Sequence, residues 1–228
     1  MKVNLEKIVN ITKAAALGDA CFTYILGEIN VGMREKEVAD LIDAYLLSHG
    51  GEALAFPTIC VSGACGSEPH GVPSEKKIES GDLVTMDFGA VVGGYCGDMT
   101  RTVAVGKPSA EMKKVYEVVL AAQFAGIAAL APGAKCKAVD AAARDVIAAA
   151  GYGEYYVHGT GHGVGQEVHE APTLNPKSKE SLKAGQAVTV EPGIYIPGTG
   201  GCRIEDLLII TETGTVNLVA SEKQLIVV

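Results

Sequence analysis

The chain has 228 residues, 48% hydrophobic and 20% charged, which is typical of a soluble globular protein with a substantial core. Its net charge of −8 and isoelectric point near 5.2 argue against a nucleic-acid partner, which would need clustered lysine and arginine. The N-terminal segment MKVNLEKIVN carries charges where an export signal has an apolar core, so we expect no export signal. The longest uncharged run, 118–134, is interrupted by Pro132 and Gly133 and is too short to span a bilayer, so we expect no membrane partner.

Six cysteines are spread along the chain without a CxxC pair, at a density too low for a disulfide framework. Together with the lack of an export signal, this pattern predicts reduced thiols in a cytoplasmic protein. We expect most of them to be small core residues.

The first half begins with a helical period of apolar residues over 4–26, closed by Gly32. A second helix is predicted over 34–49, where two glycines end it. A strand is expected at 58–62, and a loop rich in Gly, Ser and Pro follows at 63–77. From residue 82 to 105 the pattern becomes that of a hairpin with its turn at Gly93 and Gly94.

The second half repeats this order of elements. Two helices are predicted, from 108 to 130 and over 137–150, followed by a histidine-rich stretch and a loop through Pro176. Strands are expected at 187–191 and, after a turn, at 202–211, with short strands in the tail from 216 to 228. The repeat predicts an α+β fold in which two similar halves face one cleft within a single domain over 1–228.

The segment HGTGHGVGQEVHE, at 158–170, holds three of the five histidines of the chain. Its alternating glycines indicate extended backbone, in which His158 and His162 point to one face and His169 to the other. A bend or bulge after Gly165 would bring His169 back to the first two. The alternative is a glycine-rich loop with incidental histidines.

Acidic residues interrupt strands that are otherwise apolar. Asp87 and Asp98 fall on opposite arms of the predicted hairpin, where both side chains are able to face one cavity. Burying a carboxylate is costly unless it is paired, protonated or bound to a metal ion. The alternative for these two residues is a structural ion pair with the nearby Arg101.

Glu191 and Glu205 pose the same problem in the second half. Arg203 alone cannot balance the charge of four carboxylates. Two divalent cations would, and ligands of oxygen and imidazole suit Mn, Fe, Co or Zn.

Six blocks of sequence carry a resemblance to a known family. They are PHGVPS at 69–74, MDFGA at 86–90, GDMTRT at 97–102, HGTGHGVGQEVHE at 158–170, EPGIYIPGTGG at 191–201 and RIED at 203–206. In this order they resemble the pita-bread (M24) metallopeptidases, and within them most closely the Xaa-Pro peptidases (aminopeptidase P and prolidase). The resemblance covers essentially the whole chain. It implies the pita-bread fold, with two pseudo-symmetric helix-helix-strand halves around a curved, mostly antiparallel sheet.

The resemblance also implies site residues. The five metal ligands of the family fall on Asp87, Asp98, His162, Glu191 and Glu205. They imply two divalent metal ions per subunit, for which we expect Mn or Co first and Zn or Fe as alternatives. His70 and His169 match histidines near the scissile bond, and His158 and Arg203 match substrate-binding positions associated with the Xaa-Pro members.

The implied activity is hydrolysis of the N-terminal residue from Xaa-Pro peptides or dipeptides by a water that two metal ions activate. Glu191 would be the general base. His70 and His169 would donate hydrogen bonds to the substrate and to the developing oxyanion. The expected partners are short peptides, and the family allows for a homodimer.

Two alternatives remain open from the sequence. Xaa-Pro peptidases usually carry an additional N-terminal domain, whereas this sequence starts at the catalytic unit and in length is closer to methionine aminopeptidases. The HGTGH and RIED blocks favour the Xaa-Pro branch over removal of N-terminal methionine. The second alternative is a catalytically silent binding module of the same fold, against which the five intact ligand positions argue.

Overall fold

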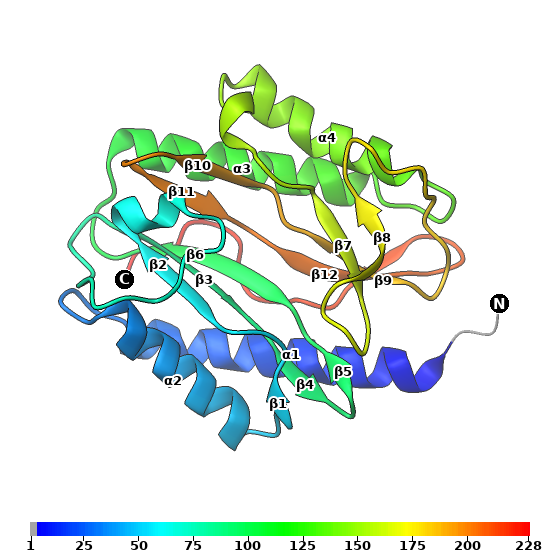
Figure 1. Ribbon diagram of the computed structural model, residues 1–228, viewed down its shortest axis with the longest axis horizontal. Helices are drawn as coiled ribbons and strands as arrows, with labels where there is room; N and C mark the ends of the chain where they lie inside the picture. Colours follow the sequence, from blue (N-terminus) through cyan, green and yellow to red (C-terminus); the bar gives the residue numbers. More distant parts are fainter. Residues whose placement is uncertain (1–3) are drawn as a thin grey trace.

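The computed structural model describes residues 4–228 (Figure 1). The prediction of no export signal rests on the N-terminal segment. Lys2, which belongs to that segment, lies outside the described residues. The described helices are α1 (Leu5–Glu28), α2 (Glu35–Ser48), α3 (Ala110–Ala128) and α4 (Cys136–Ala149), with the 3-10 turns η1 (Gly63–Ser67) and η2 (Gly153–Tyr155). The strands are β1 (Ala53–Leu54), β2 (Ile59–Ser62), β3 (Leu83–Phe88), β4 (Ala90–Val92), β5 (Tyr95–Cys96), β6 (Met99–Ala104), β7 (Gly161–Val164), β8 (Glu170–Leu174), β9 (Ala187–Val190), β10 (Gly193–Ile196), β11 (Gly200–Arg203), β12 (Asp206–Ile210) and β13 (Thr215–Asn217).

Capping side chains and glycines fix the helix ends. The side chains of Asn4 and Ser109 each accept a hydrogen bond of 3.1 Å from a backbone N–H in the first turn of α1 and α3. Gly50 and Gly151 follow α2 and α4 with positive φ, a conformation that costs glycine little. The four helices predicted from the sequence are therefore confirmed, with ends shifted by one or two residues.

Two antiparallel sheets form the centre of the molecule. One has the strand order β2-β3-β6 and the other has the order β13-β12-β9-β7-β8. They meet where the Glu205 N–H, just before β12, donates a hydrogen bond of 3.1 Å to the Thr100 carbonyl of β6. Figure 1 shows the α1–α2 pair along one side of the strands and the α3–α4 pair along the other. The prediction of an α+β fold with mostly antiparallel sheets is confirmed.

The predicted repeat is visible in equivalent hydrogen bonds. The N–H of Gly32 donates to the carbonyl of Ile78, and the N–H of Gly133 donates to the carbonyl of Leu182. Both glycines precede a helix of 14 residues, and both have φ near +90°. Gly32 and Gly133 are 101 residues apart, as are the first residues of α2 and α4. The two halves therefore share a local backbone design although their sequences have diverged.

Four predictions about the strands and the segments between them need correction. The expected hairpin of 82–105 is divided into a β3–β6 pair and a short β4–β5 pair, because the backbones cross closely at Gly89, where a Cβ would lie 2.0 Å from the Gly97 oxygen. The predicted loop through Pro176 contains β8, and the turn after β9 contains β10. The strand expected over 202–211 is interrupted between β11 and β12. The tail contributes β13 and a single bridge from Val227 to Ala104.

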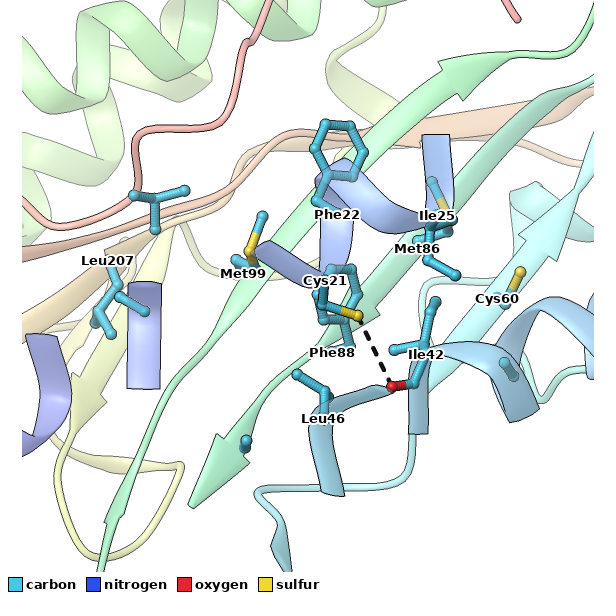
Figure 2. Close-up of a cluster of buried hydrophobic side chains, with 14 of the residues drawn as sticks. Cys21, Phe22, Ile25, Ile42, Leu46, Cys60, Met86, Phe88, Met99 and Leu207 are labelled. Carbon is cyan, nitrogen blue, oxygen red and sulfur yellow. Dashed lines mark hydrogen bonds between the residues drawn. The ribbon is translucent and has the colours of Figure 1, made fainter. Parts of the chain in front are cut away.

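A buried cluster joins the first helix pair to the sheets. Figure 2 shows Cys21 and Phe22 of α1 beside Ile42 of α2 and Phe88 of β3. The Cys21 thiol donates a long hydrogen bond of 3.8 Å to the Ile42 carbonyl. All six cysteines are free and all except Cys65 are buried, which confirms that most are small core residues. Within residues 4–228, no helix combines the length and the apolar character needed to cross a membrane.

A buried ion pair connects the two sheets to the tail. Arg101 of β6 is 1% exposed, and its Nη2 lies 2.8 Å from Oδ1 of Asp206 on β12. The same guanidinium donates to the carbonyls of Glu205 and Ser221. Burial alone would raise the pKa of Asp206, but the charges of Arg101 and Lys223 lower it overall. The pair therefore stabilises the fold above the ordinary carboxyl pKa and loses this contribution as the pH falls through the lowered value.

Arg101→Met should lower the free energy of unfolding by about 3 kcal/mol or more, because it leaves a buried carboxylate with one of its two cations removed. Urea denaturation followed by circular dichroism measures the change. Arg34→Met is the control, since Arg34 pairs with Glu37 at the surface and its loss should change stability little. Equal stability of the two variants would contradict the role given to the buried pair.

Candidate functional site

One cavity of about 490 Å³ collects every residue that the sequence predicted for the site. It lies between the loop that follows β2, the ends of β3 and β9, and the β7–β8 hairpin. The predicted residues that line it are His70, Asp87, Asp98, His158, His162, His169, Glu191, Arg203 and Glu205. Residues up to 135 positions apart in sequence therefore face a common space.

The repeat places the four carboxylates in equivalent positions. Asp87 lies near the end of β3 and Asp98 immediately precedes β6. In the second half Glu191 directly follows β9 and Glu205 directly precedes β12. Because β6 and β12 are neighbours, each half delivers two acids to the same junction. This geometry explains why acids interrupt otherwise apolar strands.

The glycine-rich histidine stretch forms the β7–β8 hairpin. His162 lies on β7, and His169 lies in the turn that follows, so that their ring centroids are 4.3 Å apart. Gly163 permits the tight return, because a Cβ there would lie 2.4 Å from the carbonyl oxygen of Ala171. The bend expected after Gly165 is thus present, and it brings His169 beside His162.

His162 is oriented toward the acids. Its Nδ1 lies 3.1 Å from the Gly163 carbonyl, which as acceptor places a proton on Nδ1 and directs Nε2 toward the acids. That Nε2 is 3.2 Å from Oε1 of Glu191 and 3.6 Å from Oδ2 of Asp98. Ligand atoms of Asp98, His162 and Glu205 lie within 4.8 Å of one another. An imidazole nitrogen and carboxylate oxygens thus converge on one point.

Asp87 pairs with Arg203 at 2.6 Å between Oδ2 and Nη2. The alternative pairing of Asp87 or Asp98 with Arg101 is wrong, since Arg101 binds Asp206 on the other side of the junction. The second oxygen of Asp87, Oδ1, is buried and has no hydrogen-bond partner within residues 4–228. A buried carboxylate oxygen of this kind is costly unless a cation or a donor meets it.

Burial raises the pKa of Asp98 and Glu205 well above the usual carboxyl range, and neighbouring carboxylates raise both further. Burial also raises the pKa of Asp87, against the opposing charge of Arg203. Glu191 differs: burial acts to raise its pKa, but the hydrogen bond and charge of His162 lower it overall. The negative charge of the four carboxylates therefore exceeds the positive charge of the side chains beside them.

These residues fit divalent metal ions. The donors are carboxylate oxygens and one imidazole nitrogen, a set suited to Mn, Fe, Co or Zn. The unpartnered Oδ1 of Asp87 supplies a further ligand atom. Two threonine hydroxyls orient the acids. Thr100 donates a hydrogen bond of 2.7 Å to Glu205, and Thr189 donates one of 3.1 Å to Glu191.

The sequence did not identify Tyr195, which connects two predicted residues. Its hydroxyl is 2.8 Å from Nε2 of His158 and accepts a hydrogen bond of 2.9 Å from Nη1 of Arg203. Burial raises the pKa of Tyr195 to about 12, so the hydroxyl stays protonated and donates to His158. A tyrosine in an apolar strand four residues after Glu191 was the available signal, because a buried hydroxyl needs a partner.

The sequence also did not identify the apolar residues that line the cavity. The cavity residues that carry it are Phe56, Pro57, Ile59, Pro69, Val72, Pro73 and Val168. They lie on the segment before β2, at the first residue of β2, on the loop after β2 and in the β7–β8 turn. The cavity therefore combines a cluster of carboxylates with apolar side chains that are able to bind an uncharged part of a ligand.

Comparison with known proteins decides the family. The sequence profile described as metallopeptidase family M24 matches residues 9–212. This chain belongs to metallopeptidase family M24. The pita-bread fold expected from the resemblance is confirmed as well. The Xaa-Pro dipeptidase structure from Bacillus anthracis superposes with a TM-score of 0.97 at 46% identity, over 99% of this chain and 64% of that one.

Curated M24 relatives extend beyond this chain. The uncharacterized peptidase YqhT of Bacillus subtilis (strain 168) is 51% identical over 97% of this chain and 63% of its own length. The Xaa-Pro dipeptidase of Pyrococcus furiosus is 44% identical over 97% of this chain and 64% of its own length. The chain therefore spans just under two thirds of the relatives it matches.

Metal binding should stabilise the fold. Mn²⁺ at about 100 times its Kd adds about 2.7 kcal/mol to the free energy of unfolding, which raises Tm by about 5–10 °C in a protein of this size. Asp98→Asn should lose most of this increase, and calorimetric titration should show at least about tenfold weaker Mn²⁺ binding. Asp145→Asn, at an exposed position of α4, should retain both. An unchanged Mn²⁺ affinity in Asp98→Asn would remove this residue from the metal site.

Proposed function

We propose that this chain is the catalytic domain, over residues 1–228, of a metal-dependent exopeptidase that releases the N-terminal residue from Xaa-Pro peptides or dipeptides. The observation that carries the proposal is the convergence of five ligand-type side chains and three further histidines on one cavity. The names of the Xaa-Pro dipeptidase relatives support the substrate. The apolar lining supports it too, because a proline ring has no N–H to satisfy.

Two divalent metal ions would be held by Asp87, Asp98, His162, Glu191 and Glu205. When bound, they would supply Lewis-acid polarisation and a water that loses its proton near neutral pH. Mn or Co is the expected metal, with Zn and Fe as alternatives. The hydroxyls of Thr100 and Thr189 would hold the carboxylates of Glu205 and Glu191 in the productive orientation.

The side chains around this centre have distinct tasks. Glu191 would take the proton of the attacking water at its carboxylate and pass it to the leaving nitrogen. His70 and His169, both exposed to the cavity, would donate hydrogen bonds to the substrate and to the oxyanion. The hydrogen-bonded series from Arg203 through Tyr195 fixes the ring of His158 for substrate binding.

The setting of this activity is also proposed. Short peptides are the expected substrates. A homodimer is an assembly that this proposal allows. The six free cysteines support a reducing compartment such as the cytoplasm.

Two peptides distinguish the substrate classes. After chelation and re-addition of Mn²⁺ or Co²⁺, a peptide beginning Xaa-Pro should release its first residue, and a peptide beginning Met-Ala should not. Product analysis by mass spectrometry measures both. Cleavage of Met-Ala alone would assign the site to removal of N-terminal methionine, and the absence of metal-dependent cleavage of either peptide would favour a silent binding module.

Glu191→Gln should lower kcat by about 10²–10⁴-fold, since it removes the proposed general base while keeping the side chain's shape. Steady-state kinetics at saturating Mn²⁺ separates this effect from weaker metal binding. Glu154→Gln, an exposed acid in η2, serves as the control and should keep wild-type kcat. Turnover near the wild-type level in Glu191→Gln would exclude the general-base role.

A further inference from the structure

A buried glutamate lies outside the cavity but contacts the loop that carries His70. Glu35, the first residue of α2, is 0% exposed. Its carboxylate makes no cap for its own helix, where the Glu37 side chain accepts from the N-cap N–H instead. A fully buried carboxylate must be satisfied by hydrogen bonds, and those of Glu35 all come from the two ends of one loop.

Both oxygens of Glu35 are used. Oε1 accepts from the backbone N–H of Ser62 at 2.7 Å and from its hydroxyl at 2.8 Å. Oε2 accepts from the backbone N–H of Ser74 at 3.1 Å and from its hydroxyl at 2.6 Å. Ser62 ends β2, and Ser74 lies four residues after His70. One carboxylate therefore closes the segment from 62 to 74 into a loop.

Further hydrogen bonds near Glu35 hold the same loop. The Glu35 N–H donates to the carbonyl of Lys76 at 3.0 Å, and the Lys36 N–H donates to that of Ser74 at 3.2 Å. The ammonium of Lys76 in turn donates to the Ser62 hydroxyl and to Asp82. Within the loop, Nη1 of Arg203 donates to the carbonyl of Pro69, the residue before His70, at 3.1 Å.

The His70 ring depends on this backbone. Within residues 4–228 its side chain makes no hydrogen bond, so the position of the ring follows that of the loop. His169, its counterpart in the second half, lies in a turn held by the β7–β8 ladder. Among the described residues the loop of His70 has no strand ladder of its own, and an isolated bridge from Arg34 to Lys77 follows it. The residue of α4 equivalent to Glu35 is Cys136, so the carboxylate occurs only in the half that lacks the ladder.

We propose that Glu35 is a positioning residue that holds His70 over the cavity by closing the 62–74 loop. The inference rests on the proposed function for its kinetic consequence, because His70 is assigned there to the substrate and the oxyanion. A displacement of about 1 Å at such a group costs up to about 10²-fold in rate. Glu35→Gln replaces two acceptor lone-pair sites with an N–H₂ donor and so breaks the pattern of four donors on one carboxylate.

The test is a double-mutant cycle with kcat and KM measured on an Xaa-Pro peptide at saturating Mn²⁺. Glu35→Gln should lower kcat by about tenfold or more with unchanged Mn²⁺ affinity, whereas in the His70→Ala background the same change should alter kcat less than about twofold. Ser74→Ala keeps the carboxylate and removes the Ser74 hydroxyl, which donates to Glu35 and accepts from the Lys76 N–H, and it should show a smaller effect of the same kind. An equal loss of kcat in both backgrounds would show a general structural role and overturn the inference.

Hydrogen exchange supplies a readout that does not need activity. The four backbone amides within 69–74, those of His70, Gly71, Val72 and Ser74, should exchange at least about tenfold faster in Glu35→Gln, while those of β3 stay protected. Ile42→Val is the matched control, since it destabilises the same helix without touching the loop. Unchanged exchange at 69–74 would overturn the inference whatever the kinetics. Absence of metal-dependent turnover in the wild-type chain together with faster exchange in Glu35→Gln would instead contradict the proposed function alone.

Discussion

Four carboxylates share one cavity where the two sheets meet, and much of the surrounding structure serves to hold them there. Burial and mutual repulsion both oppose their negative charge, so that the pKa values of Asp98 and Glu205 are raised. Arg203 is bound to Asp87, and His162 faces Asp98 and Glu191. These contacts balance only part of the charge. Divalent cations are the natural complement of the remaining acid, which is why the metal centre governs the proposed chemistry.

The internal repeat explains both the symmetry and the asymmetry of the site. Each half brings one acid from the end of β3 or β9 and one from just before the strand paired with it, β6 or β12, and the close approach of β6 and β12 unites them. The segments that precede β3 and β9 differ between the two halves. The second half forms a ladder that presents His162 and His169, whereas the first half has an irregular loop for His70 that Glu35 closes.

Stability and function share residues at the junction. Arg101 donates to the carbonyl of Glu205, and its partner Asp206 is the next residue along the chain. The ion pair therefore fixes the backbone on which a proposed metal ligand is carried. The buried cluster between α1, α2 and the strands includes Phe88 and Met99 (Figure 2). These residues directly follow Asp87 and Asp98 in sequence, so the cluster supports the backbone that carries these two acids. A rigid support of this kind keeps ligand atoms within the narrow distances that metal coordination needs.

The sequence alone determined the four helices, because caps, terminal glycines and apolar periods are local signals. It also determined which residue types would meet, since acids in apolar strands and histidines among glycines are costly without a function. The sequence left open an ion pair of Asp87 or Asp98 with Arg101, and the structure excludes it because Arg101 binds Asp206. Only the tertiary structure decided the partners. The pairing of Asp87 with Arg203, the place of Tyr195 and the closure of the His70 loop by Glu35 join segments up to 116 residues apart. A local sequence pattern predicts which face of a strand or helix a side chain occupies. The residues that it contacts on that face depend on how one half of the molecule packs against the other.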